Sequence, residues 1–319
     1  MGMEGEGTEF PLPMILNTIF LLEDGSAMPS DLTFWVQTIF NCLGLGGLML
    51  LIAIGLNIIY GINRVINLAH GSIYALGAYF GYTLVAKGLS FFWALLVAPI
   101  MVVAVGLAIE RSVIAPIRAR PMLYSLILTY GVMVTIDGLA KYIWGVQPQF
   151  IATPAFLSRT VYIAEIPYPF YRFFMLFVTA GVMVGLMFLL GKTKMGITMR
   201  AASHIPEMVS VLGINMNLVH MGVFALGCAL AGIGGVIAGP LLTVYPMMGH
   251  EMLISCFVVL VIGGLGSLRG SVVAALLVGT VQTLGYIFIT DYAMVVVYVM
   301  MALVLSFMPR GLLGEGKFE

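Results

Sequence analysis

Long apolar stretches separated by short polar segments fill most of this chain of 319 residues. A membrane-spanning helix needs roughly 20 mostly apolar residues, because the hydrocarbon core of a bilayer is ~30 Å thick. The pattern predicts an all-α, polytopic membrane helix bundle with about nine hydrophobic segments. They are residues 32–63, 65–86, 88–109, 121–144, 173–191, 218–245, 252–268, 270–290 and 292–309. The glycines of segment 65–86 leave open whether that segment spans the membrane or is broken.

Two polar connections are long enough to have structure of their own. Residues 146–171 contain four prolines, and we expect an ordered extracytoplasmic loop with short strands around Val161–Ile166. Residues 192–217 begin with basic residues and continue into a short amphipathic stretch. All other connections are short, so the spans form one integral membrane domain.

Composition supports a membrane protein. Hydrophobic residues make up 61% of the chain and charged residues 9%, and the mean hydropathy is +1.09. A soluble domain carries roughly 25% charged residues and could not bury so much apolar surface. Fourteen basic residues balance fourteen acidic ones, which argues against nucleic acid as a partner and leaves membrane lipid as the environment. The three cysteines lie in apolar runs, so buried packing is favoured over a metal site or a disulfide.

Basic residues gather on the cytoplasmic side of membrane proteins. If loop 192–217 is cytoplasmic, nine alternating crossings place the N-terminus outside and the C-terminus inside. Ten basic residues then lie inside: Arg64, Arg111, Arg118, Arg120, Lys192, Lys194, Arg200, Arg269, Arg310 and Lys317. Four lie outside: Lys87, Lys141, Arg159 and Arg172. This asymmetry favours a multi-pass protein of the cell (inner) membrane in that orientation.

The chain divides into three parts on this view. Residues 1–33 are acidic, lack Lys and Arg, and form an extracytoplasmic leader in which 11–22 is either a short interfacial helix or irregular chain. Residues 34–314 form the transmembrane domain, with a cytoplasmic loop at 192–217. Residues 315–319 form a cytoplasmic tail.

No nucleotide or cofactor motif is complete. Gly191-Lys192-Thr193 resembles the end of a phosphate-binding loop, but Leu186 stands where that loop needs glycine. The glycine-rich stretch 263–270 lies between two apolar segments and lacks dinucleotide spacing. We interpret it as a tight turn between closely packed helices, and expect no cofactor in this chain.

Polar residues cluster at the start of the second segment, where a membrane helix would be costly to interrupt. Asn67, His70 and Tyr74 lie at i, i+3 and i+7, and Gly71 beside them could admit another backbone. One interpretation is a solvated helix start. The other is a broken helix that lines a translocation path. A metal site is not indicated, because His70 has no second ligand at suitable spacing.

The loop 192–217 predicts a short helix, since Pro206 suits its first turn and Gly213 its C-terminal cap. Its candidate contact residues are Arg200, Glu207, Met208, Leu212 and Gly213. The charged members could form charge-assisted contacts, and the apolar ones could fill a groove on a cytosolic partner. The alternative is an interfacial connector resting on lipid headgroups.

Together these stretches resemble the permease subunit of branched-chain amino-acid ABC importers. The similarity runs from about residue 35 to 314 and rests on 61–81, 109–118, 194–215, 227–239, 263–270 and 308–312. The chain departs from the family pattern at Ile205, Pro206, Met208, Val209 and Ser255, and in its long leader. These departures bear on the substrate and on the ATPase partner, not on the membrane fold.

The resemblance implies a transport subunit without enzymatic activity, which forms the path for amino acids, most naturally branched-chain ones. Its implied partners are a homologous permease (a second copy or a relative), two cytosolic ABC ATPases that use the ATP, and an extracytoplasmic binding protein. Urea, short amides or sugars are alternative substrates within the superfamily. A carrier driven by ion gradients is an alternative of another class; Asp137 would suit it, although Lys141 four residues later is placed to neutralise that acid. An intramembrane enzyme is the third alternative.

Overall fold

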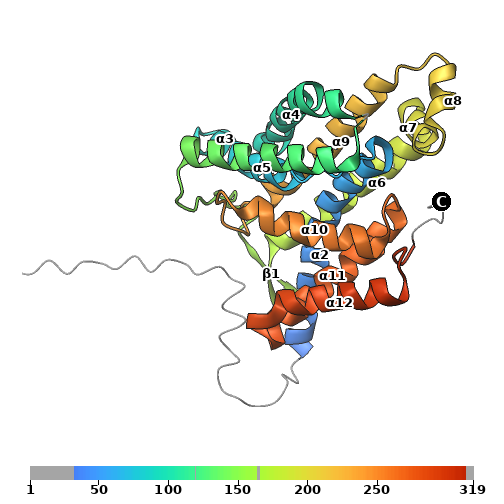
Figure 1. The fold of residues 1–319 in the computed structure, drawn as a ribbon. Helices are drawn as coiled ribbons and strands as arrows, with labels where there is room; N and C mark the ends of the chain where they lie inside the picture. The colour runs from blue at the N-terminus through green and yellow to red at the C-terminus, as the bar shows by residue number, and fades with distance from the viewer. Residues whose placement is uncertain (1–31, 119, 164–165, 314–319) are drawn as a thin grey trace, which may run out of the picture.

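The computed structural model describes residues 32–118, 120–163 and 166–313, so the expected leader 1–33 and tail 315–319 lie almost entirely outside the described residues. The described chain is a bundle of eleven α-helices with one small hairpin (Figure 1). Its elements are α2 (Leu32–Asn63), α3 (His70–Ala86), α4 (Phe91–Ile109), η2 (Glu110–Ile114), η3 (Ala115–Ile117), α5 (Met122–Trp144), β1 (Thr160–Ile163), β2 (Ile166–Pro169), α6 (Phe170–Lys192), α7 (Lys194–His204), α8 (Pro206–Val211), α9 (Met216–Ala238), α10 (Met248–Gly263), α11 (Leu268–Phe288), η4 (Thr290–Tyr292) and α12 (Ala293–Phe307).

Each of the nine hydrophobic segments corresponds to a helix of the described chain. Seven helical stretches are long and apolar enough to cross a membrane: α2, Phe91–Ile117, α5, α6, α9, α11 and Thr290–Phe307. The other two segments correspond to α3, with 17 residues, and α10, with 16. At 1.5 Å per residue these two helices are shorter than the ~30 Å hydrocarbon core.

Several helix boundaries differ from the expected ones, and the segment expected at 252–268 lies earlier in the chain, as α10 (Met248–Gly263). Segment 65–86 becomes helical only at His70, so the chain is broken between α2 and α3. Segment 218–245 was expected to remain helical to Tyr245, but α9 ends at Ala238. The reason lies in Pro240, which has no amide hydrogen to donate to the Val236 carbonyl and whose ring crowds that carbonyl.

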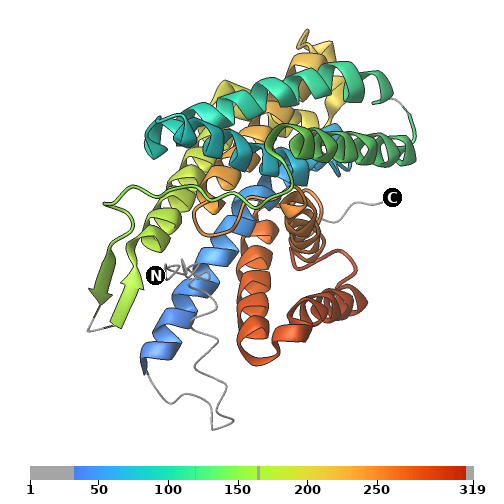
Figure 2. The same cartoon turned by 90° about the vertical axis from the view of Figure 1, so that its left-hand side faces the viewer.

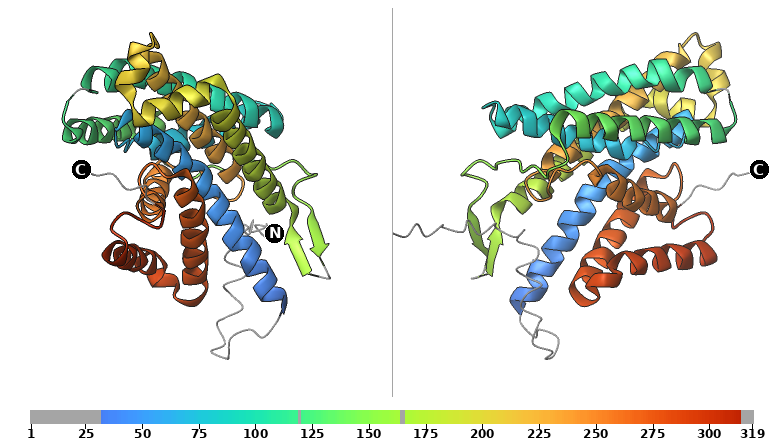
Figure 3. Two further views of the ribbon diagram at one scale, coloured as in Figure 1. Left: turned by 90° about the vertical axis from the view of Figure 1, so that its right-hand side faces the viewer. Right: turned by 60° about the vertical axis from the view of Figure 1, so that its left-hand side comes forward.

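Helix α2 forms the centre of the bundle. It packs against α11, α9, α10 and α6, and 89% of its most apolar window is buried within the protein. A helix that is apolar on all sides is expected in such a position. Figures 2 and 3 show α2 running through the molecule, with α4 and α5 on one side of it and α11 and α12 on the other.

Glycines allow these helices to pack at short distances. A Cβ added to Gly77 of α3 would lie 2.6 Å from the carbonyl oxygen of Gly232 in α9. Lipid tails are as apolar as the side chains, so association in a membrane depends on such close van der Waals packing.

The polar connections are ordered at both ends of α6. Strands β1 and β2 pair antiparallel, with Thr160 opposite Pro169, where short strands were predicted. The loop before this hairpin is joined to the loop after α9 by a bridge between Gln149 and Val244. At the other end of α6, α7 and α8 form a pair of short helices (Figures 1 and 3).

The predicted short helix of loop 192–217 is α8. Pro206 occupies its first turn, and Gly213 follows its end with a φ of 79°. Helix α7 was not predicted. It begins at an N-cap formed by Thr193, whose hydroxyl accepts a hydrogen bond from the Gly196 amide at 3.1 Å. The sequence did contain a signal for α7, because Thr193 is a suitable N-cap residue and precedes a short amphipathic run.

Candidate functional site

The break between α2 and α3 lies inside the protein. Residues 64–67 have no regular structure, and Arg64 has a left-handed φ of 53°. Thr129 of α5 lies against this irregular backbone, and its hydroxyl is also 2.7 Å from the Ser125 carbonyl of its own helix. Its hydroxyl accepts from the Leu68 amide at 3.2 Å and can donate to the Ile66 carbonyl at 3.1 Å. Irregular backbone is tolerated at membrane depth when protein groups satisfy it in this way.

The four predicted path residues lie at this break but have different surroundings. Asn67 precedes α3, so it does not continue the helical face of His70 and Tyr74. Asn67 and His70 are both fully buried. The His70 ring is fixed by a 3.1 Å contact between Nε2 and the Ile52 carbonyl of α2. Both polar atoms of the Asn67 amide lack a protein partner within the described chain.

Gly71 is a contact point between helices, as its sequence context predicted. A Cβ at this position would collide with the carbonyl oxygen of Gly249 in α10. A Cβ at Gly249 would lie 2.6 Å from the Gly71 oxygen. The first turns of α3 and α10 therefore meet backbone to backbone, and no larger residue fits between them.

A buried polar cluster lies beside this crossing. Ser72 donates a hydrogen bond to Asp137 Oδ1 at 2.7 Å, and His250 Nδ1 lies 3.2 Å from Asp137 Oδ2. The sequence favoured Lys141 as the partner of Asp137, but no ion pair joins these two residues in the described chain. The cluster instead links α3, α5 and α10.

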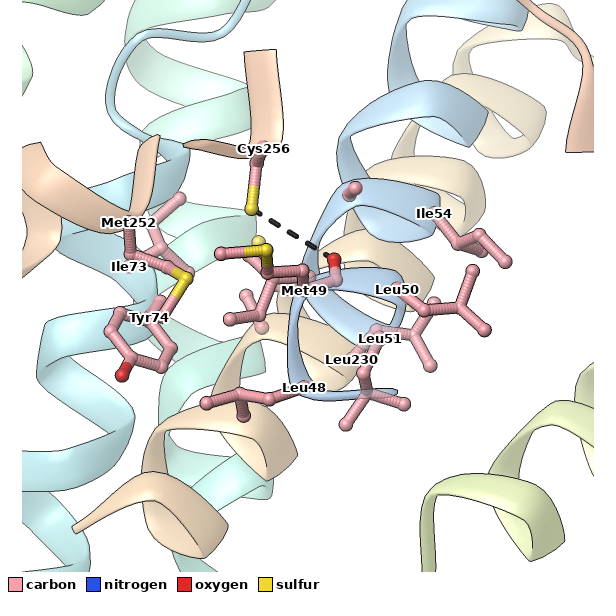
Figure 4. Close-up of a cluster of buried hydrophobic side chains, with 14 of the residues drawn as sticks. Leu48, Met49, Leu50, Leu51, Ile54, Ile73, Tyr74, Leu230, Met252 and Cys256 are labelled. Carbon is pink, nitrogen blue, oxygen red and sulfur yellow. Dashed lines mark hydrogen bonds between the residues drawn. The ribbon is translucent and has the colours of Figure 1, made fainter. Parts of the chain in front are cut away.

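A cavity of about 530 Å³ opens next to the first turn of α10. Its walls come from α2, α3, α6, α10, α11, η4, α12 and the loop after α9. Most lining side chains are apolar, and Tyr74 is the one predicted path residue among them. Figure 4 shows Met49 of α2 and Met252 of α10 reaching toward each other, with Tyr74 beside Met252. These three side chains close the inner end of the cavity, where Met49 and Tyr74 are almost completely buried.

The cavity lies at one end of the bundle. It is lined by the first half of α2, the first turns of α6 and α10, the last turns of α11 and the start of α12. The hairpin directly precedes α6, whereas α7 follows the opposite end of that helix. The cavity and the α7–α8 pair therefore lie at opposite ends of the molecule.

Between these two ends, Asn57 of α2 ties the bundle together. Its Nδ2 donates to the Ser267 carbonyl at 3.0 Å and to Ser271 Oγ at 2.7 Å, and its Oδ1 accepts from the Gly266 amide at 2.6 Å. The glycine-rich turn between α10 and α11 is thus fixed to α2, and it is the tight turn that the sequence predicted. Asn57 was missed, although a lone amide in a long apolar segment was a readable signal.

The α7–α8 pair presents an exposed surface. Glu207 and Met208 are exposed on α8, and Leu212 just after it is 72% exposed, whereas Val209 is buried beneath them. Arg200 of α7 is exposed, and its guanidinium donates to the Gly191 carbonyl at 3.4 Å. Gly213 ends the surface with its positive φ.

A charged anchor lies near this surface, at the start of α9. Arg118 forms an ion pair with the buried Glu110 and donates to Asn217 Oδ1 at 3.2 Å. Burial lowers the pKa of the Arg118 guanidinium, and the Glu110 carboxylate offsets part of that effect. The segment after α4 is thereby fixed to the start of α9.

Comparison with known proteins identifies the family. Residues 38–305 match the family described as branched-chain amino acid transport system / permease component. The high-affinity branched-chain amino acid transport system permease protein BraD of Pseudomonas aeruginosa is 31% identical, over 91% of this chain and 99% of BraD. The corresponding LivH of Salmonella typhimurium is 29% identical, over 92% of this chain and 99% of LivH.

More distant similarities extend over a similar range. The probable branched-chain amino acid transport permease protein LivH of Methanocaldococcus jannaschii is 25% identical over 84% of this chain and 89% of its own length. The solved structure of PsaBC from Streptococcus pneumoniae in complex with Fab covers 92% of this chain and 95% of its own, at 14% identity and a TM-score of 0.47. That structural similarity is too low to carry a conclusion. The match over residues 38–305 shows that the chain belongs to the permease components of branched-chain amino acid transport systems, and it is a membrane transport subunit, not an enzyme.

Proposed function

We propose that this chain forms one half of the translocation path of an ABC importer for branched-chain amino acids. It works with a second permease (another copy or a homologue), two cytosolic ATPases and an extracytoplasmic binding protein. The observation that carries the proposal is the arrangement along the bundle axis: a cavity at one end and an exposed helix pair at the other. ATP is used by the partner ATPases, and this chain holds no cofactor.

The orientation follows from charge. With α7–α8 in the cytoplasm, the N-terminus lies outside, the C-terminus lies inside, and the ten-to-four distribution of basic residues agrees with the positive-inside rule. The cavity then opens outward, where a binding protein would deliver substrate. The loop before the hairpin is joined through the Gln149–Val244 bridge to the loop after α9, which contributes to the cavity lining.

The path is proposed to run along the first turn of α3. Tyr74 lines the cavity, while Asn67, His70 and Gly71 fix the start of α3 against α2 and α10. Passage requires the contact between Met49, Met252 and Tyr74 to open. A change at the Gly71–Gly249 crossing would move Tyr74 and Met252 together, because both lie within one turn of it.

Coupling is assigned to the α7–α8 pair. An ATPase must act on a rigid element, and α8 is a six-residue helix, which is marginal alone in water but is packed here through Val209. Met208 and Leu212 supply apolar contact, Arg200 and Glu207 supply charge, and Gly213 sets the exit of the chain. The ATPase cycle would thereby bias the permease between its two access states.

The test of coupling is Gly213→Val, with Gly145→Val as a matched control. Both glycines have a φ near 80° and no atom within 4 Å of an added Cβ, and the ψ of −176° at Gly145 makes it at least as demanding a site for valine, so Gly145→Val is a stringent control for backbone strain. Gly145 follows the end of α5 and, in the proposed orientation, lies on the extracytoplasmic side. We expect Gly213→Val to abolish binding-protein-stimulated ATPase activity or to release the ATPases, and Gly145→Val to leave both unchanged. Normal stimulation and normal co-purification with Gly213→Val would remove the coupling role.

A further inference from the structure

The cavity contains a single carboxylate among its described lining residues. This is Glu251, in the first turn of α10, and its side chain is exposed. It takes part in neither of the two ion pairs of the described chain. Arg172, the only guanidinium in the lining, lies with its Cζ 5.5 Å from the centre of the Tyr168 ring. Glu251 therefore faces the cavity without a cation of its own, and its described hydrogen-bond neighbour is the hydroxyl of Tyr245, another lining residue.

An exposed carboxylate within a membrane domain is costly when it faces lipid, and such groups usually mark a substrate or ion pathway. Glu251 lies between two buried lining residues of α10, Met248 and Met252, and one turn before Ser255, which also lines the cavity. Its side chain therefore meets the space that a substrate would enter.

Two polar atoms elsewhere in the lining have no hydrogen-bond partner among the residues that the structure describes. The Tyr74 hydroxyl belongs to a side chain with 0% exposure, and Oε1 belongs to Gln282 with 4% exposure. The amide nitrogen of Gln282, by contrast, contacts the Tyr286 hydroxyl at 3.3 Å. The free Gln282 oxygen and the Glu251 carboxylate are both acceptors, so the cavity offers acceptors to a ligand that carries N–H donors.

The apolar part of the lining is rich in methionine, with Met49, Met175, Met248, Met252 and Met294. Methionine is flexible and polarisable, so it adapts to apolar groups of different shape. Such a surface suits aliphatic side chains that branch at different carbons.

We infer that Glu251 binds the α-ammonium group of an aliphatic amino acid in this cavity, with the branched side chain placed against the methionines. The inference rests on the proposed function, since it assigns a recognition residue within the same path. It predicts that the cavity itself distinguishes amino acids from aliphatic solutes without an ammonium group.

The first experiment measures leucine uptake into proteoliposomes that contain the complete transporter. The variants are Glu251→Gln, which removes the charge at constant shape, and Glu251→Asp, which keeps the charge. Asp291→Asn is the control, because Asp291 is an exposed carboxylate beside the lining residue Thr290 but not in the lining. A hydrogen bond to a charged group is lost in Glu251→Gln, so uptake at low leucine should fall roughly tenfold or more. Glu251→Asp should recover part of it, and Asp291→Asn should resemble the wild type.

The second experiment needs no transport. Thr243→Cys introduces a thiol at a half-buried position of the cavity lining, whereas the native cysteines Cys42, Cys228 and Cys256 are buried, so the parent protein gives the background. The reagents are 2-aminoethyl and 2-sulfonatoethyl methanethiosulfonate. The rate at which each reagent labels the introduced thiol is divided by its rate with a small thiol in solution. The ammonium reagent should react at least about threefold faster than the sulfonate while Glu251 is present, because opposite charges attract across the cavity. The preference should disappear when Glu251→Gln is added.

The outcomes separate the two proposals. Wild-type uptake in Glu251→Gln, or an unchanged ammonium preference, would overturn the role of Glu251. The other outcome is that the ammonium reagent is preferred only while Glu251 is present, but the wild-type complex takes up no leucine. In that case the cation site stands and the proposed function is overturned.

Discussion

Thr129 shows how a single side chain permits an irregular segment inside a membrane protein. One hydroxyl serves an amide and a carbonyl of the chain between α2 and α3, and it is itself completely buried. Water is not available there to replace those bonds. The broken helix therefore depends on a residue more than 60 positions away in the sequence.

Replacing this hydroxyl by a methyl group gives a direct prediction. Thr129→Val should lower the free energy of unfolding by about 1–3 kcal/mol, because it leaves buried backbone groups unpaired. Thr135→Val is the control: Thr135 is exposed on the same helix and bonds only to the Gly131 carbonyl one turn earlier. Thermal unfolding of the detergent-solubilised protein measures both. Equal midpoints for the two variants would contradict the bridging role.

Residue contacts were the least predictable part of the site. The sequence indicated that residues 67–74 were unusual, but local spacing could not reveal that His70 contacts Ile52 or that Asp137 contacts Ser72 and His250. The i, i+4 rule suggested Lys141 for Asp137, because it considers one helix at a time. Tertiary packing of α3 and α10 against α5 supplied closer partners.

At the scale of elements, long apolar segments predicted helices reliably, because a membrane leaves the backbone few alternatives. The ends of the helices depend on local residues: α9, for example, ends just before Gly239 and Pro240. The short polar helix α7 was missed because its signal is a cap and a brief amphipathic pattern, not a long apolar run. The close approach of another backbone at Gly71 was readable from the sequence, whereas its partner, Gly249 of α10, was not.

That crossing should tolerate no side chain. Gly71→Ala should destabilise the protein by about 1–3 kcal/mol, because its methyl group would overlap the backbone of Gly249 and push the helices apart. Gly131→Ala is the matched change, since nothing lies within 4 Å of a Cβ at Gly131 on α5. It should be neutral or stabilise the helix by up to ~1 kcal/mol. Denaturant titration of the two purified variants compares them, and a stable Gly71→Ala protein would refute the close contact.

At the scale of the whole molecule, the cavity could not be predicted, since it is built from six α-helices and a loop that are far apart in the sequence. The family and the α8 helix could be predicted from the sequence, because both depend on local motifs. The structure adds their relation in space: a cavity at one end of the bundle, lined in part by Met49, Met252 and Tyr74, and an exposed helix pair at the other end. A subunit of this kind has a path but no energy source of its own.

Leucine uptake into proteoliposomes tests this account most directly. The complete complex should take up leucine only when the binding protein is outside and ATP is on the side of α7–α8, and this chain alone should take up none under a proton or sodium gradient. Uptake by the chain alone, driven by such a gradient without ATPases, would contradict the account and identify an ion-coupled carrier.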